Sequence, residues 1–471
     1  METLQRTANR GSISTGPYDI DNSLKLESDN TERVNKASGT ISGAGNRRTF
    51  TISFWTKRTE INGVKQYLFE AGNSDSDTDR FTLRFGTGDT FDIQSQSTWL
   101  VTNRKFRDTS AWYHFVIKVD TTDGTAADRM KLYVNGVEET SFSTDNRSSI
   151  NENHDFAVNN TEDHIIGNSQ IEGSKYYNGY ITEWIQLDGT AAAPTSFGEF
   201  DADSGIWKPK DPSALSFGTN GFWLDFEDSS NLGNDASGGT DFTLTNVAAA
   251  DQATDTPTNN FCTLNPLVNF KYTTNGITQG GTEFGDNTGG GIGGAFGTMA
   301  VTAGKWYWEM KLTQQVDHYP GVSAVDDGDN VAASSDPQDE NSTFRFNISA
   351  ARIEYVSSGS QTYGSLDAFS DFHTAGDIIG IALNMDDNQI SIYGNGTLQS
   401  GVANSSLADA ANKMVVPFHG TINDTVQYNF GGYSAWTPSS AVNDENGYGT
   451  FEYSPPSGYY ALCTKNLAEY G

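Results

Sequence analysis

The chain has 471 residues, and its 60 acidic against 29 basic residues give a formal net charge of −31 at pH 7. A field of this sign repels nucleic acid and anionic membrane, so both are excluded as expected partners. Excess acid either keeps a large assembly in solution or adapts a protein to a salty medium. With 12% aromatic residues, 49 glycines and 12 prolines, the composition favours a turn-rich β protein, long enough for two domains.

The N-terminus and the cysteines limit where the protein works. Residues 1–20 are polar and lack the apolar core of a signal peptide, and no segment approaches the ~20 apolar residues of a membrane span. We therefore expect an N-terminal docking arm at 1–20 and no membrane insertion. Cys262 and Cys463 are too few for a disulfide framework, so we expect buried free thiols, with a bridge between them as the alternative.

Short strands with alternating apolar residues follow one another through the first half. FTISFWTKR at 50–58 places Phe50, Ile52 and Phe54 on one face. The other expected strands are SLKLES (23–28), WYHFVIKVD (112–120), MKLYVNGVEE (130–139) and YYNGYITEWIQLDG (176–189). Many short strands with turns between them predict an antiparallel β-sandwich.

The first half resembles a laminin G-like or pentraxin-like domain of the concanavalin A superfamily. The resemblance rests on an "h-S-h-W-h-K" strand, a "W-x-H-h-h" strand, an "h-Y-V-N-G" hairpin and a closing "G-x-I-x-E" strand, in that order. It implies two stacked sheets. GFWLDFED at 221–228 is expected to add an edge strand to them, before a loop-rich connector.

The second half repeats the strand pattern. GKWYWEMKL at 304–312 alternates apolar and polar residues, and a hairpin is expected within 377–401, ending on the turn dipeptide Asn395-Gly396. With the segments 415–431 and 455–462, these motifs resemble a SPRY domain, whose members are binding modules. We therefore predict an all-β protein of two tandem antiparallel β-sandwiches of the jelly-roll, concanavalin A-like type, at 21–250 and 271–471, with a linker at 251–270.

The order of parts resembles a family of virion-associated structural proteins in tailed bacteriophages, especially marine ones. The resemblance implies a non-enzymatic tail fibre or surface fibre, assembled in the host cytoplasm and then carried on the extracellular particle. Its expected partners are other virion proteins, through the arm at 1–20, and a host-surface glycan or protein. A homo-oligomer such as a trimer is expected. The alternatives are a capsid or tail decoration protein that contacts only virion proteins, and a carbohydrate-active hydrolase.

Aromatic residues beside polar ones are the candidates for ligand recognition, because sugars stack their C–H faces on exposed rings. The ligand-binding candidates are Trp99, Tyr176, Tyr177, Tyr319, Asp326 and Asp327. The last three belong to the segment that matches an early binding loop of SPRY domains.

Two sets of carboxylates are candidates for other chemistry. Asp75, Asp77 and Asp79 alternate in one loop, as calcium ligands do, so calcium is the one cofactor we consider; a solvated hairpin tip is the alternative. Glu27, Asp29 and Glu32 match the spelling E-x-D-x-x-E of retaining β-glucanases. Polar residues intervene, so a surface loop is favoured there, and no catalytic residue is assigned.

Overall fold

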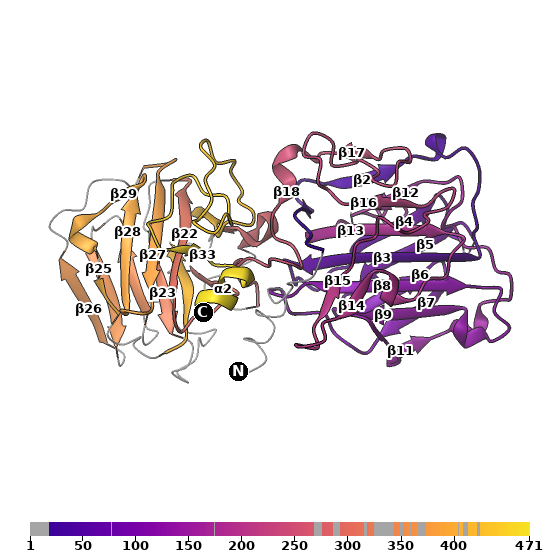
Figure 1. Cartoon of the computed structure of the whole chain (residues 1–471), viewed down its shortest axis with the longest axis horizontal. Helices are drawn as coiled ribbons and strands as arrows, with labels where there is room; N and C mark the ends of the chain where they lie inside the picture. The colour runs from indigo at the N-terminus through magenta and orange to yellow at the C-terminus, as the bar shows by residue number, and fades with distance from the viewer. Residues whose placement is uncertain are drawn as a thin grey trace. The chain divides into compact units, whose positions relative to one another are not determined.

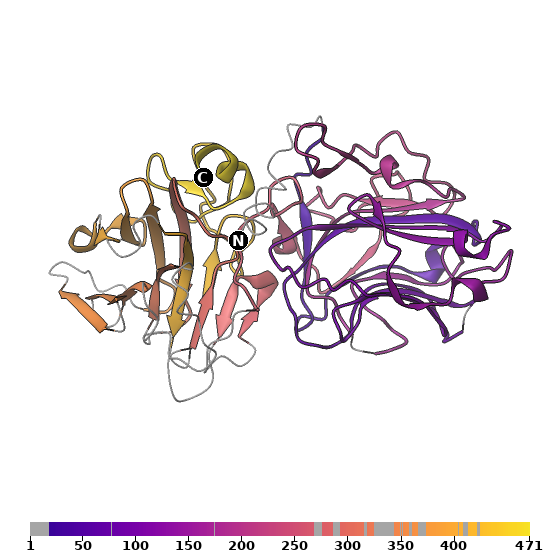
Figure 2. The ribbon, with the colours of Figure 1, turned by 90° about the horizontal axis from the view of Figure 1, so that it is seen from below.

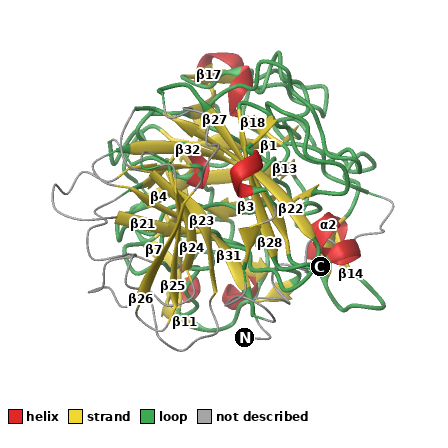
Figure 3. Ribbon diagram, turned by 90° about the vertical axis from the view of Figure 1, so that its left-hand side faces the viewer, coloured by secondary structure: helices red, strands yellow, loops and turns green. Residues whose placement is uncertain are grey.

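The computed structural model describes residues 18–76, 78–173, 175–267, 276–285, 293–314, 318–324, 343–348, 350, 352–357, 360–365, 374–403, 405–407, 413–421 and 424–471. The contacts divide the described chain between Thr258 and Asn259 into a first unit and a second unit (Figures 1 and 2). Strands and loops dominate both units, and the helices are short (Figure 3). None of the helices in the described part of the chain has the length and apolar character needed to cross a bilayer.

Two antiparallel sheets form the first unit, which confirms the predicted sandwich. One sheet has the order β10 (Val137–Glu138), β9 (Met130–Val134), β8 (Tyr113–Asp120), β3 (Thr49–Arg58), β13 (Gly179–Asp188), β1 (Ser23–Leu26) and β18 (Gln252–Ala253), with β16 (Phe222–Leu224) also paired to β13. The other has the order β11 (Phe142–Asp145), β7 (Thr98–Thr102), β6 (Phe91–Gln94), β5 (Arg80–Phe85), β4 (Gln66–Gly72), β12 (His164–Ile166), β2 (Arg33–Lys36) and β17 (Thr243–Thr245). A separate hairpin joins β14 (Gly198–Phe200) to β15 (Trp207–Pro209).

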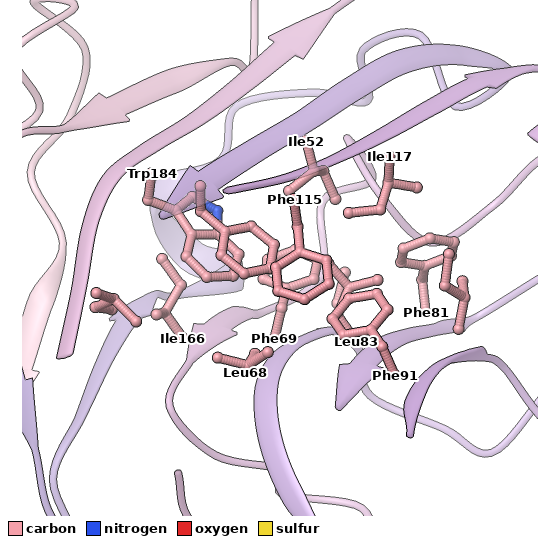
Figure 4. Close-up of a cluster of buried hydrophobic side chains, with 14 of the residues drawn as sticks. Ile52, Leu68, Phe69, Phe81, Leu83, Phe91, Phe115, Ile117, Ile166 and Trp184 are labelled. Atoms are coloured by element: carbon pink, nitrogen blue, oxygen red, sulfur yellow. The ribbon is translucent and has the colours of Figure 1, made fainter. Parts of the chain in front are cut away.

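Aromatic rings from both sheets fill the core of the first unit (Figure 4). Phe54 stacks on Trp184 with ring centroids 4.2 Å apart, and Phe91 stacks on Phe115 at 4.3 Å. The first pair lies within one sheet, whereas the second joins β6 to β8 across the sandwich. The alternation read from residues 50–58 and 112–120 therefore gives the correct inward faces, because every second residue of a strand points to one side.

Two sheets also form the second unit, as predicted. The larger has the order β19 (Ile277–Thr278), β20 (Glu283–Gly285), β32 (Thr425–Asn429), β22 (Lys305–Leu312), β27 (Ile378–Asn384), β28 (Gln389–Gly394) and β29 (Thr397–Leu398), with β30 (Ser405–Ser406) paired to β28 and β33 (Tyr460–Ala461) to β22. The smaller has the order β21 (Gly293–Phe296), β31 (Val415–Thr421), β23 (His318–Ala324), β24 (Thr343–Asn347), β25 (Arg352–Ser357) and β26 (Ser360–Ser365). Trp306 and Trp308 of β22 and Phe346 of β24 lie in the core between them.

The ends of each unit meet. In the first unit, Thr258 Oγ1 bonds to both the N–H and the carbonyl of Ile20, at 3.1 and 2.9 Å. In the second, the Cys262 N–H donates to the carbonyl of Leu462 at 3.0 Å, just before α2 (Thr464–Tyr470). Residues 251–264 lie within the expected linker, but 251–258 belong to the first unit and 259–264 to the second. Cys262 and Cys463 are buried and are not joined in a disulfide, as expected.

Candidate functional site

A polar cavity of about 510 Å³ opens in the first unit. Three segments that are far apart in sequence line it: Lys36 with residues 40–42, then residues 216–221, then residues 237–240. Lys36 is the last residue of β2, and residues 216–221 lead into β16. We call this cavity the three-loop pocket.

Buried polar groups hold the loop at 216–221. The N–H of Asp188 donates to the carbonyl of Phe217 at 2.8 Å, and the Asp188 carboxylate accepts the N–H of Asn220 at 3.0 Å. The Asn220 side chain donates to the carbonyls of Gly43 and Asn159, at 2.8 and 3.0 Å. These hydrogen bonds, all within the protein, hold the loop in place.

Asp235 shapes the loop at 237–240 in a similar way. Its Oδ1 accepts the N–H of Ser237 at 3.1 Å and the Ser237 hydroxyl at 2.6 Å. The same oxygen accepts the N–H of Trp223 at 3.0 Å, which ties the loop to β16. Gly238 has a φ of +85°, a left-handed conformation that glycine adopts without strain. The pocket is therefore formed in advance of any ligand.

Lys36 is the one charged side chain among the described residues that line the pocket. It is buried, and its Nζ lies 3.8 Å from Asp235 Oδ2 and 5.4 Å from the ring centroids of Phe222 and Phe242. Burial lowers the pKa of Lys36, and the Asp235 carboxylate opposes that shift. Asp235 Oδ2 has no hydrogen-bond partner within the described part of the chain, so this ammonium is its main electrostatic contact.

The remaining lining is hydroxyl-rich, with two apolar side chains. The apolar groups are Ile41 and Phe217; the Phe217 ring lies parallel to that of Trp223, with centroids 6.2 Å apart. The hydroxyls belong to Thr40, Ser42, Ser216, Thr219, Ser237 and Thr240. No carboxylate, imidazole or thiol stands among these described lining residues. Such a surface can hydrogen-bond and pack against a ligand, but it offers no acid and base pair for hydrolysis.

The aromatic residues chosen from the sequence lie elsewhere, and three of them are buried. Trp99 is in β7 with its Nε1 bonded to Ser95 Oγ at 2.9 Å, and Tyr177 bonds to Thr56 Oγ1 at 2.6 Å. Tyr319 is buried within β23, not in a loop. The expectation of exposed rings is wrong for these three, because Trp99 and Tyr177 pack in the core of the first unit and Tyr319 lies in a buried stretch of β23. Tyr176 is half-buried and does not line the pocket.

The acidic candidates are only partly described. Asp77, Asp326 and Asp327 lie outside the described residues. Asp75 is exposed, with Arg80 Nη1 3.0 Å from its Oδ1, and a guanidinium at that distance is a poor neighbour for calcium. Among the residues that the structure describes, no group of three or more His, Cys, Asp or Glu side chains is placed to hold a metal ion.

The glucanase-like carboxylates form part of the framework of the first unit. Glu27 and Glu32 are both buried, which corrects the expectation of a surface loop. Lys25 Nζ lies 3.0 Å from Glu32 Oε1, and the N–H of Glu27 donates to Glu32 Oε2 at 2.7 Å. Glu32 therefore joins β1 to β2 through a buried ion pair, and neither glutamate lines the three-loop pocket.

The residues that matter most for the pocket were missed from the sequence. Lys36, Phe217 and Asn220 match no motif, and only the fold brings their segments together. The available signal was the glycine-rich spelling of two connector segments, SFGTNG at 216–221 and SGGT at 237–240. Glycine-rich segments of this kind indicate loops, but they do not indicate which loops lie next to each other in the fold.

One comparison with known proteins falls within the first unit. Residues 31–185 match the family described as the concanavalin A-like lectin/glucanases superfamily. This part of the first unit is thus similar to laminin G-like, concanavalin A-like domains. A comparison with curated proteins gives no match.

Three solved structures illustrate the similarity. The SPRY domain of human HERC1 is 17% identical, with a TM-score of 0.25 over 35% of this chain and 96% of that one. A candidate carbohydrate-binding protein from Bacteroides ovatus is 16% identical, with a TM-score of 0.34 over 49% of this chain and 59% of that one. A heptameric SAP-like pentraxin from Limulus polyphemus is 17% identical, with a TM-score of 0.28 over 37% and 80%. Values this low identify no ligand or partner for the present chain.

Proposed function

We propose that the protein is a non-enzymatic virion protein of a tailed bacteriophage, a tail or surface fibre that attaches the particle to a host-surface glycan. The observation that carries the recognition role is the three-loop pocket, preformed and hydroxyl-rich, in a unit whose residues 31–185 match the concanavalin A-like lectin/glucanases superfamily. The phage setting is supported by the order of sequence motifs alone. On this proposal the arm at 1–20 docks on other virion proteins, and assembly takes place in the host cytoplasm.

Many copies on one particle would compensate for a low affinity of each single pocket. Several pockets that bind one cell surface give an avidity well above the affinity of a single pocket, provided that they can engage together. A homo-oligomer such as a trimer would present its pockets in this way. Calcium is not required by this proposal, and we treat it as an additive to be varied in the experiment.

The test is binding of the purified chain to an array of immobilised glycans. Thr219 is exposed on the pocket wall, so Thr219→Trp should block the pocket and abolish retention. Thr140 is an exposed residue between β10 and β11, which are edge strands of the two sheets and do not pair with β2. Thr140→Trp is therefore the matched control, and this variant should bind glycans normally. No retention by folded wild-type chain, or release of reducing sugar from a bound glycan, would contradict the proposal.

A decoration protein that contacts only virion proteins is the second candidate. The observation that favours it is a group of half-buried tyrosines in the second unit, where Tyr460 and Tyr470 stack with centroids 4.0 Å apart. Tyrosine is enriched at protein interfaces. Locating the chain in an image of the intact particle separates the candidates, because a pocket covered by capsid or tail protein would favour decoration.

A further inference from the structure

We infer that the three-loop pocket selects a neutral pyranose over the corresponding acidic sugar, with Lys36 donating to a sugar hydroxyl. The inference rests on the proposed function and names the ligand class of the same site.

The charges around the pocket disfavour an anionic ligand. The Lys36 ammonium already faces a buried carboxylate, Asp235, at 3.8 Å. A second buried carboxylate, Asp188, lies behind the loop at 216–221, where it accepts the N–H of Asn220. Two carboxylates and one ammonium leave this region with a negative balance, in a chain whose net charge is −31. A sugar carboxylate entering the pocket would be repelled, whereas a hydroxyl would not.

A hydroxyl can use Lys36 without disturbing this arrangement. The ammonium carries three donors, and at 3.8 Å its contact with Asp235 is longer than an ordinary hydrogen bond. The rings of Phe222 and Phe242 hold the ammonium in place. Lys36 is therefore a fixed donor with capacity left for a neutral oxygen acceptor.

Glycines bring the backbone to the surface of the pocket. A Cβ on Gly221 would lie 1.9 Å from the carbonyl oxygen of Phe217, and one on Gly239 would lie 2.3 Å from Asp235 Oδ2. Both glycines are therefore required by the packing of the loops themselves, and the pocket wall at these positions consists of peptide groups and small hydroxyls. These groups both donate and accept, as a ring bearing several hydroxyls requires.

The apolar side chains of the pocket complete the match to a pyranose. Phe217 and Ile41 offer carbon surface among the polar groups of the pocket wall, and the Trp223 ring lies parallel to the Phe217 ring. A pyranose ring likewise has C–H faces and a hydroxylated rim. The cavity of about 510 Å³ lies within the range of about 300–1,000 Å³ that is common for ligand pockets.

The experiment compares sugars that differ only at C6. Oligosaccharides ending in glucose or galactose are immobilised beside partners ending in glucuronic or galacturonic acid, with mannose- and N-acetylglucosamine-ended chains added. The intact wild-type chain should bind at least one neutral member ~10-fold more tightly than its C6 acid. Thr219→Trp should abolish that binding. Thr219→Lys adds a positive charge at the rim and should move the preference toward the acid, whereas Thr219→Gln should not.

Thermal melting first shows that the variants fold. Tighter binding of the acids, still lost with Thr219→Trp, overturns the inference and leaves the proposed function standing. Binding that ignores Thr219→Trp places the ligand elsewhere and overturns the inference. Retention of no sugar by the folded chain overturns both. Lys36→Met should weaken neutral binding ~10-fold, and unchanged binding by this variant would remove Lys36 from its assigned role.

Discussion

Glu183 lies at a bulge of β13, where its φ of +49° falls in the left-handed region. Its carboxyl oxygens accept the hydroxyl of Tyr18 and the Nε1–H of Trp223, each at 3.0 Å. Burial raises the pKa of Glu183 to about 8, and these two hydrogen bonds only partly oppose the shift. At neutral pH the folded protein therefore keeps a proton on Glu183 that the unfolded chain releases.

This difference predicts a pH-dependent stability. The folded pKa lies above the unfolded value near 4.5, so the folded state binds more protons between pH 5 and 8 and stability falls as pH rises through that window. Glu183→Gln removes this dependence. The free energy of unfolding of the wild type should fall relative to the variant by on the order of 4 kcal/mol across the window, at about 1.4 kcal/mol per pKa unit. Urea unfolding at several pH values measures it, and parallel curves would contradict the prediction.

Glu309 of β22 forms hydrogen bonds that hold a distant segment of the second unit against its sheet. Its Oε2 and Oε1 accept the N–H groups of Glu452 and Tyr453, at 2.9 and 2.8 Å, so one side chain ties a distant segment to the sheet. Burial raises the pKa of Glu309 to about 7, against the effect of these bonds. Its ionised form, which alone accepts both bonds fully, therefore predominates only above neutral pH.

Glu309→Gln should destabilise the second unit by about 1–3 kcal/mol at pH 8, because the amide group turns one acceptor into a donor facing an N–H. Chemical denaturation at pH 8 measures the loss. Glu469→Gln, at an exposed position in α2, is the control and should change stability by less than about 0.5 kcal/mol. Equal effects of the two variants would show that the buried contacts of Glu309 contribute little.

At the scale of elements, the loop at 216–221 depends on a glycine as much as on its hydrogen bonds. A Cβ at Gly221 would lie 1.9 Å from Phe217 O and 2.5 Å from Gln186 O, both backbone atoms that cannot move cheaply. By contrast, a Cβ at Gly43 meets nothing within 4 Å, although Gly43 also belongs to the surroundings of the pocket.

Gly221→Ala should therefore destabilise the first unit by about 1–3 kcal/mol and weaken glycan binding, because the loop must shift. Gly43→Ala should leave both nearly unchanged. Thermal melting and the glycan array measure the two effects. Normal melting and binding by Gly221→Ala would show that the loop adapts and that the pocket is less rigid than its hydrogen bonds indicate.

Strands could be read from the sequence far better than the site. Alternation in 50–58 and 304–312 gave the correct faces of β3 and β22, since a sandwich covers one side of each strand with apolar groups. Trp99 and Tyr319 stand beside polar residues in the sequence, yet both rings are buried within β7 and β23. The pocket could not be predicted, because its walls come from loops whose meeting depends on the whole sheet order.

Each unit has its own core. Phe115 belongs to the core of the first unit and Trp308 to that of the second, and each is fully buried. A cavity in one core removes packing from that unit alone. The two sandwiches should therefore respond separately to core mutations.

Phe115→Ala should destabilise the first unit by about 3–5 kcal/mol, and Trp308→Ala should do the same to the second. Calorimetry of the full chain should show two transitions, each variant lowering a different one. Pulse proteolysis with identification of the protected fragment assigns the transitions. A single transition lowered equally by both variants would mean that the units unfold together.

The meeting of the ends within each unit has a consequence for how such chains are assembled. Ile20 contacts Thr258, and Cys262 contacts Leu462, so the first and last parts of each sandwich lie beside one another. A body with adjacent termini can be grafted into a surface turn of an unrelated host protein without stretching either. We therefore expect that one sandwich can be replaced by another domain without disturbing the fold of the remaining sandwich. Such an exchange would give the protein a new recognition specificity.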